Sequence, residues 1–171
     1  FFSLSKPGSS ATQLSYLRKF NSAGTVSFTN SLINTTQYNS NVFGMTKTDA
    51  QGRIYTYGTL RAVNTNYFSN AVYCYDNNGA LQWSSAINDL DWYFGYPGRM
   101  TVDNNNNVIF SGKRQTTQGD PFTYDIVLRK VNSSGVQQWQ VYYDFGNKFD
   151  LLSSIVTDSN GDIYMVALNR T

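Results

Sequence analysis

The chain has 171 residues, with 13 Lys or Arg against 11 Asp or Glu, a formal net charge of +2, and no histidine. Because the charge is small and forms no large basic cluster, we expect neither nucleic acid nor an acidic membrane surface as a partner. The lack of histidine removes the commonest general base and transition-metal ligand. The 13 Tyr and 11 Phe, beside only 3 Pro, favour half-buried strands joined by polar turns over helices.

The single cysteine and the apolar runs exclude further classes of protein. Cys74 has no partner for an internal disulfide or a cysteine zinc site. We expect a packed thiol in a strand, with an intermolecular bridge as the alternative. The longest apolar run, Ile163–Leu168, is far shorter than the roughly 20 residues of a membrane helix. Phe1–Leu4 does not resemble a signal peptide, so any export signal is expected to be already removed.

An internal repeat is anchored by three glycines, which fall 55 and 56 residues apart. A large aromatic residue follows each glycine after four positions. The three pairs are Gly24 with Phe28, Gly79 with Trp83, and Gly135 with Trp139. A register kept over two periods indicates one structural unit repeated along the chain.

A second series of turns alternates with the first. Each begins with Asp and precedes a short run rich in β-forming residues. The turns are 49–52, 103–106 and 158–161, and the runs that follow them are 53–58, 107–112 and 162–167. The Asp side chain can accept backbone N–H bonds two residues on, and Gly at the fourth position supplies a positive φ. Asn106 replaces that Gly in the middle turn, and Asn is the next residue most tolerant of this conformation.

Taken in chain order, the predicted strands form four units. A partial unit of three strands covers 1–32, complete units cover 43–86 and 98–143, and a partial unit of two strands covers 153–168. Within 98–143 the strands are expected near 99–103, 107–113, 125–132 and 136–143. A four-stranded unit recurring at about 50 residues is typical of propeller blades. We therefore predict an all-β fold of β-propeller blades, about three of them, belonging to a larger ring or assembly.

These motifs resemble the SBBP-type β-propeller repeat of secreted and surface proteins. The similar pattern is Asp-x-x-Gly, an Ile-Tyr-rich strand, a Lys-containing strand, Asn-x-x-Gly and Trp, and it extends from about Ser15 to Leu168. The resemblance implies a propeller fold and an extracellular or cell-surface location, and that repeat carries no shared catalytic residues. The chain departs from the pattern where Tyr73 and Cys74 replace an Arg-Lys pair and where Phe28 replaces Trp.

Both ends of the chain fall on the same strand of the repeat. Residues 1–5 lie in the phase of a second strand, and so do residues 163–168. Propellers typically need at least four blades to close a ring, and unpaired strand edges invite aggregation. We therefore expect the open edges to be covered by the rest of a longer chain or by other copies in a ring or filament.

The longer connections, 60–69, 87–98, 113–123 and 144–150, are expected together on one face, where ligands usually bind. Aromatic rings beside carboxylates suit a glycan, while packing between blades is the plainer interpretation of the same residues. The candidate ligand-binding residues are Asp89, Asp91, Trp92, Tyr93 and Tyr96 in one connection and Asp144 and Asp150 in another.

No catalytic, cofactor or metal site is predicted. A glycosidase needs two acids about 5–10 Å apart, and Asp120 joins the four candidate acids as a further option by its face. Each of these acids is equally suited to a loop or turn. Asp158–Asp162 resembles the start of a calcium loop but lacks the later bidentate Glu, so we interpret it as a turn. Possible glycosylation sequons begin at Asn34, Asn132 and Asn169.

The sequence therefore predicts a non-enzymatic structural or binding scaffold, located outside the cell or at its surface. Its partners are expected to be the rest of its own chain or other copies, with glycans or surface proteins as further candidates. The alternatives are a lectin-like propeller that uses the 87–98 and 144–150 connections, a glycoside hydrolase, and an intracellular protein-interaction propeller.

Overall fold

The computed structural model describes residues 15–32, 38–62, 68–91, 98–116, 123–146 and 149–170. These residues form strands and turns and contain no helix, which confirms the all-β prediction for the described part of the chain. Accordingly, this part has no helix long and apolar enough to cross a membrane. The strands are β1 (Tyr16–Phe20), β2 (Val26–Ser31), β3 (Tyr38–Thr48), β4 (Ile54–Ala62), β5 (Phe68–Tyr75), β6 (Leu81–Asp91), β7 (Met100–Val102), β8 (Val108–Gln115), β9 (Tyr124–Val131), β10 (Gln137–Tyr143), β11 (Phe149–Thr157) and β12 (Ile163–Arg170).

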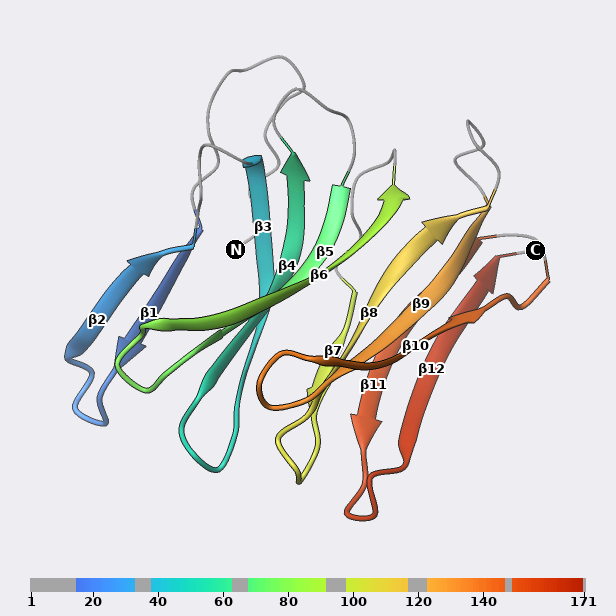
Figure 1. The fold of residues 1–171 in the computed structure, drawn as a ribbon. Coiled ribbons are helices and arrows are strands. Elements are labelled where there is room, and N and C mark those ends of the chain that lie inside the picture. Colours follow the sequence, from blue (N-terminus) through green and yellow to red (C-terminus); the bar gives the residue numbers. More distant parts are fainter. Residues whose placement is uncertain are drawn as a thin grey trace.

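The strands build three sheets, none of them closed on itself, which lie side by side in chain order (Figure 1). β1 and β2 form an antiparallel pair, and β3-β4-β5-β6 form an antiparallel sheet in sequence order. In the third sheet, β7, β8, β9 and β10 follow one another in the same way. β11 joins that sheet through one parallel contact, Phe149 with Tyr124, and β12 pairs with β11.

The short turns form for the reasons that the sequence suggests. Asp76 Oδ1 accepts hydrogen bonds from the backbone N–H of Asn78 at 2.8 Å and of Ala80 at 2.9 Å. The corresponding residues of the other short turns accept the same pair of bonds. Gly79 has a φ of 86°, and Asn106 has a φ of 60°, which confirms the prediction for that asparagine. In Figure 1 these turns all lie at the lower end of the sheets.

All four predicted connections are shorter than expected, so their boundaries are wrong, and in two of them the difference changes the place of candidate site residues. β6 continues to Asp91, which pairs with Phe68, and therefore the first part of the expected 87–98 loop is strand. β11 begins at Phe149, so Asp150 belongs to a strand and not to the 144–150 loop. Polar residues mark both places in the sequence, but backbone pairing with a distant strand extends the ladder through them.

Three apolar clusters join successive groups of strands, and the third of them lies within the β7–β12 sheet. The first joins β1–β2 to the β3–β6 sheet and includes Leu17 and Tyr75. The second joins the β3–β6 sheet to β7–β9 and includes the fully buried Tyr55 and Val127. The third lies between β8–β9 and β11–β12. Cys74, buried in the second cluster, confirms the prediction of a packed thiol, and burial raises the pKa of this thiol to about 11.

The aromatic residues of the first two repeats, Phe28 and Trp83, each pack under the glycine turn of the following sheet. A Cβ on Gly79 would lie 2.8 Å from Phe28 Cε2, and a Cβ on Gly135 would lie 2.7 Å from Trp83 Cδ2. In addition, Trp83 Nε1 donates to Ser133 O at 3.1 Å. The glycines are therefore needed both for their positive φ and because the aromatic ring leaves no room for a side chain.

Candidate functional site

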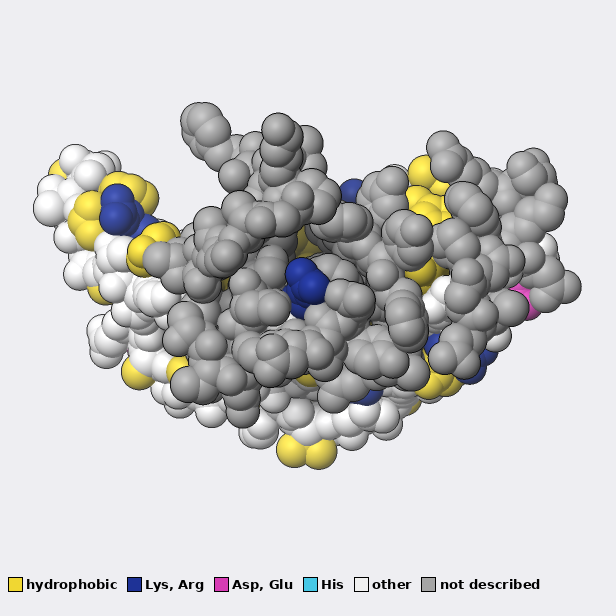
Figure 2. Space-filling model, turned by 90° about the horizontal axis from the view of Figure 1, so that it is seen from above, with side chains coloured by type: hydrophobic (Ala, Val, Ile, Leu, Met, Phe, Trp, Pro, Cys, Tyr) yellow, Lys and Arg dark blue, Asp and Glu magenta, His cyan; other side chains and the backbone are white. Residues whose placement is uncertain are grey.

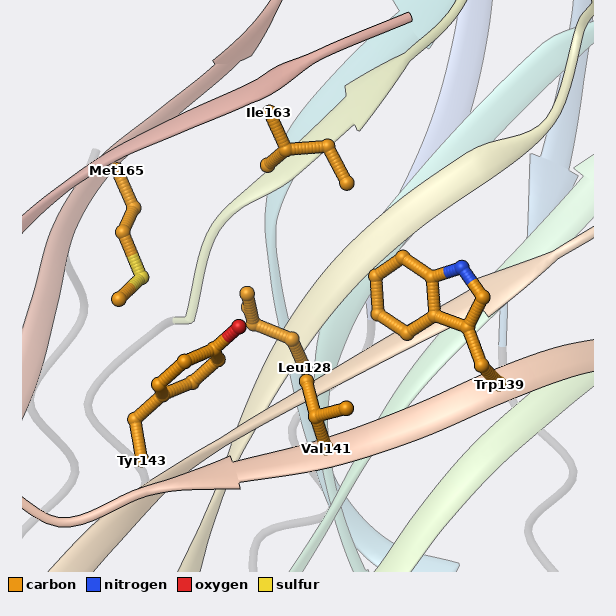
Figure 3. Close-up of a pocket in the computed structure, with 6 residues that line it drawn as sticks. All are labelled: Leu128, Trp139, Val141, Tyr143, Ile163 and Met165. Carbon is orange, nitrogen blue, oxygen red and sulfur yellow. The ribbon is translucent and has the colours of Figure 1, made fainter.

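The third aromatic residue of the series, Trp139, borders an open pocket of about 410 Å³. Strands β9, β10 and β12 supply its walls. The lining residues are Leu128, Trp139, Val141, Tyr143, Ile163 and Met165. Figure 3 shows Ile163 and Met165 of β12 on one side of this space and Leu128, Trp139 and Tyr143 on the other.

The chemistry of this pocket suits burial of apolar groups. The polar side-chain groups of its six lining residues are the indole N–H of Trp139 and the hydroxyl of Tyr143. Such a lining contains no carboxylate, amine or thiol for acid–base or nucleophilic chemistry. It would bind an apolar side chain or ring, with a hydrogen bond to the indole to fix its position.

The equivalent space one repeat earlier is filled by a neighbouring strand. Leu128, Ile163 and Met165 correspond by the repeat to Val72, Val108 and Phe110, which are all fully buried. Val127 and Val131 of β9 pack against these three residues in one cluster. The pocket therefore corresponds to the space that β9 fills in the preceding repeat. The sequence contains a signal for it, because Phe28 and Trp83 are each followed by the next glycine of their series, Gly79 and Gly135, whereas Gly135 is the last glycine of that series in these residues and precedes Trp139.

A second candidate is an acidic cluster. Carboxylate oxygens of Asp125, Asp144 and Asp150 all lie within 4.8 Å of one another. Asp144 and Asp150 were predicted as site residues and do come together. Asp125 of β9 was missed, since it lies far away in sequence and no local motif marks it.

The carboxylates of this cluster already accept hydrogen bonds from the protein. The fully buried Asp150 accepts from Phe145 N at 2.8 Å and from Asn169 Nδ2 at 2.9 Å. Asp144 Oδ1 accepts from Gly146 N at 2.7 Å. Asp125 pairs with Arg114 at 2.7 Å. These bonds fix the connection between β10 and β11, in agreement with the packing interpretation.

Two adjacent cations of β8 lie near this region, one against a carboxylate of the cluster and one against two aromatic rings. Arg114 pairs with Asp125, and the buried Lys113 has its Nζ 5.4 Å from the ring centroid of Tyr124 and 5.2 Å from that of Phe149. The carboxylates are close enough for a glycosidase pair. However, Asp150 is inaccessible, so it could not reach a substrate.

The remaining predicted ligand-binding residues are not tested. The backbone of Asp89 and Asp91 forms the last part of β6, and their side chains are not among the described ones. The positions that fall wholly outside the described residues are Asn34, Trp92, Tyr93, Tyr96 and Asp120. The predicted glycan site in the 87–98 region therefore stays a prediction.

The two described sequon asparagines both make hydrogen bonds. Asn132 Oδ1 accepts from Ser134 N and Val136 N and so closes the β9–β10 turn. Asn169 Nδ2 donates to Phe145 O at 2.7 Å as well as to Asp150. Glycosylation at either residue stays a prediction.

The β7–β8 turn carries an ion pair whose carboxylate is buried. Lys130 Nζ lies 2.9 Å from Asp103 Oδ2. Burial alone would raise the pKa of Asp103, but hydrogen bonds from Asn107 and Lys130 and the charge of Lys130 outweigh it, so this pKa lies below its usual value. The pair connects β9 to the turn between β7 and β8.

No protein-family model matches this chain, and no curated protein matches it either. The similarity to the SBBP-type repeat therefore depends on the residues quoted for it, from about Ser15 to Leu168.

Proposed function

We propose that this chain is a non-enzymatic structural and binding scaffold made of propeller-type blades, acting outside the cell or at its surface. The observation that carries the proposal is the recurring contact between sheets. Phe28 packs against Gly79 in the same way that Trp83 packs against Gly135 one repeat later. A row of sheets joined by equivalent contacts gives a rigid framework on which the connections can vary.

The polar side chains that have been placed also support a scaffold. Asp49, Asp103 and Asp158 close turns, and Asp150 holds a connection against its strand. An acid in such a role cannot also move a proton for a substrate without breaking the local structure. Among the described residues, the clustered carboxylates therefore fit a structural role better than a catalytic one.

The scaffold proposal is tested by glycan-array binding of the chain beside its Trp92→Ala and Asp144→Asn variants. We expect no selective binding to any glycan. The Asp162→Asn variant is the matched control, because it changes an exposed acid at the opposite end of the sheets. Selective binding that Asp162→Asn retains and the other two variants lose would contradict the scaffold and support a lectin.

A lectin is the second candidate, and one observation favours it. Phe145 is about half exposed and directly follows Asp144, which belongs to the acidic cluster. An exposed ring beside a carboxylate is the combination that stacks on a sugar and accepts its hydroxyl protons. An Asp144→Asn variant would then lose binding, whereas the scaffold predicts no change.

The proposed location is tested by the intact mass of the native protein before and after enzymatic removal of N-glycans. A loss of mass that maps to Asn132 or Asn169 supports an exported protein. An unmodified protein recovered from inside the cell would support the intracellular interaction propeller instead.

A further inference from the structure

Apolar side chains are exposed at both ends of the row of sheets, although their equivalents inside the row are buried. Tyr16 and Phe20 of β1 are 58% and 55% exposed, while the equivalent Val127 and Val131 of β9 are 0% exposed. Figure 2 shows hydrophobic side chains at the β1–β2 end and at the β10–β12 end. Each end of the row therefore exposes one of the two surfaces that pack together at the junction of the β3–β6 sheet with β7–β9.

The β12 end has a second uncovered face. Tyr164 is 57% exposed, and Val166 and Leu168 are about as exposed. The equivalents of Tyr164 and Val166 two repeats earlier, Tyr55 and Tyr57, are fully buried in the cluster that joins their sheet to the following one. A partner that continues the row would cover this face as well as the Trp139 pocket.

We propose that the pocket beside Trp139 and the edge of β12 opposite β11, which pairs with no other described strand, bind the β1–β2 hairpin of a second copy of this chain. β11 and β12 of one copy and β1 and β2 of the next would then form one four-stranded sheet. This inference rests on the proposed function, because it treats each sheet as a repeat of the same blade. Tyr16 and Phe20 of the second copy enter the pocket, as Val127 and Val131 fill the equivalent space.

The glycine turn of the β1–β2 hairpin matches the pocket. A Cβ on Gly24 would meet nothing within 4 Å, whereas Gly79 and Gly135 each contact an aromatic ring. Placed against β12 of another copy, Gly24 would cover Trp139. Ser22 would then stand where Ser133 stands, and its carbonyl would accept the indole N–H of Trp139 as Ser133 O accepts that of Trp83.

Charge complementarity supports the same partner. Lys19 occupies in β1 the position of Lys130 in β9, and Asp158 occupies the position of Asp103. The ion pair between Lys130 and Asp103 can therefore be repeated between two copies, by Lys19 and Asp158. Lys19 Nζ also donates to Asn77 O at 3.0 Å and to Asn77 Oδ1 within its own copy, and an ammonium group has three donors, so one remains for Asp158.

Two observed sheets define the register of the new contact. Tyr55 pairs with Cys74 between β4 and β5, and Ile109 pairs with Lys130 between β8 and β9. These pairs are equivalent by the repeat, and the next pair in the series is Tyr164 with Lys19 of the second copy. The contact joins different surfaces of the two copies, so repeating it gives a ring or a filament.

Residues 1–5 would compete for the same edge of β1, because their predicted strand has the phase of β12. A variant that lacks residues 1–14 is therefore expected to associate at least as tightly as the full chain. Weaker association of that variant would count against the proposal.

Register-specific cross-linking tests the contact. Lys19→Cys protein is mixed with Tyr164→Cys protein under mild oxidation, and we expect a disulfide-linked dimer on a non-reducing gel. Val26→Cys mixed with Tyr164→Cys is the control, because Val26 lies on β2 and the proposed contact places β1 between it and β12. Cys74 can stay, since it is buried. Equal cross-linking of both mixtures, or of neither, would overturn the proposed register.

Sedimentation velocity over a concentration series tests association without cross-linking. We expect the wild-type chain to associate and Phe20→Asp to weaken association at least tenfold. Leu81→Asp is the matched control, because Leu81 is also 55% exposed and lies on β6, where it lines a groove beside β2 that the proposed contact does not use. A wild-type chain that stays monomeric at millimolar concentration would overturn the proposal and assign the pocket to a further segment of its own polypeptide or to another protein. That result would reject self-association without rejecting the proposed scaffold function. Selective glycan binding would reject the scaffold function, and the sedimentation data would still decide whether copies associate.

Discussion

The junction between the β3–β6 sheet and β7–β10 differs from the end formed by β11 and β12, although the two regions have equivalent sequences. Tyr55 is fully buried at the junction, while Tyr164, two repeats later, is mostly exposed. Each is the second residue of the second strand of a unit, and each has its hydroxyl near the Asp that opens the preceding turn. The comparison shows that the repeat specifies the local structure, whereas the next sheet in the row determines whether a residue becomes core.

The largest expected difference is between Tyr55→Ala and Tyr164→Ala. Tyr55→Ala removes a fully buried ring, and we expect a loss of about 3–5 kcal/mol in the free energy of unfolding. Tyr164→Ala should change it by less than about 0.5 kcal/mol in the monomer. Urea denaturation at low micromolar concentration measures both. Equal losses would show that the end of the row is already covered within one copy.

The next difference concerns the glycine turns. Gly135→Ala adds a Cβ that would lie 2.7 Å from Trp83 and also strains a positive φ, so we expect a loss of about 2–4 kcal/mol. Gly24→Ala has only the φ penalty, about 1–2 kcal/mol. Thermal denaturation of both variants tests this ranking. A larger loss for Gly24→Ala would mean that its turn contacts another part of the chain.

A smaller effect is expected in acid. The folded pKa of Asp103 lies below the ordinary value of 3.8, so the unfolded chain takes up this proton first as the pH falls. The stabilisation is therefore present above about pH 4 and is lost as the pH drops through the folded pKa.

Replacing the charge at this position should flatten the acid dependence. Asp103→Asn keeps an oxygen for the turn, and we expect its Tm to fall less between pH 7 and pH 3 than that of wild type. Asp162→Asn, at an exposed turn position, is the control and should resemble wild type. An unchanged pH profile for Asp103→Asn would show that the Lys130 pair does not contribute to acid stability.

The smallest effect is chemical and concerns the thiol at the junction. Because burial raises the pKa of Cys74 to about 11, the folded chain should react with iodoacetamide at pH 8 much more slowly than the urea-unfolded chain. Mass spectrometry over time measures the two rates. Rapid labelling of the folded chain would mean that the junction opens frequently.

The parts of the fold that were predictable are those with local causes. The short turns follow from an Asp or Asn and a Gly or Asn three residues later, and Asn106 adopts the expected positive φ. The extent of β6 and β11 was not predictable in this way. Both strands continue through polar residues because Phe68 and Arg170, which are distant in sequence, supply backbone partners.

For the candidate sites too, local features were visible in the sequence and contacts between distant strands were not. Trp139 stood out in the sequence because it keeps the register of Trp83, but the pocket beside it becomes visible only when β9, β10 and β12 are placed together. Asp144 and Asp150 were proposed from their neighbourhood in sequence. Their contact with Asp125 depends on the pairing of β9 with β11, which no local pattern encodes.

Amide hydrogen exchange of the chain at two concentrations tests the central claim most directly. The claim is that equivalent strands differ only in whether a further sheet covers them. At micromolar concentration, β4, β5, β8 and β9 should exchange slowest, and the amides of β1 and β12 should exchange much faster. At millimolar concentration β1 and β12 should gain protection while the inner strands stay unchanged. Slow exchange of β12 at both concentrations, or no gain for β1 and β12, would contradict the account.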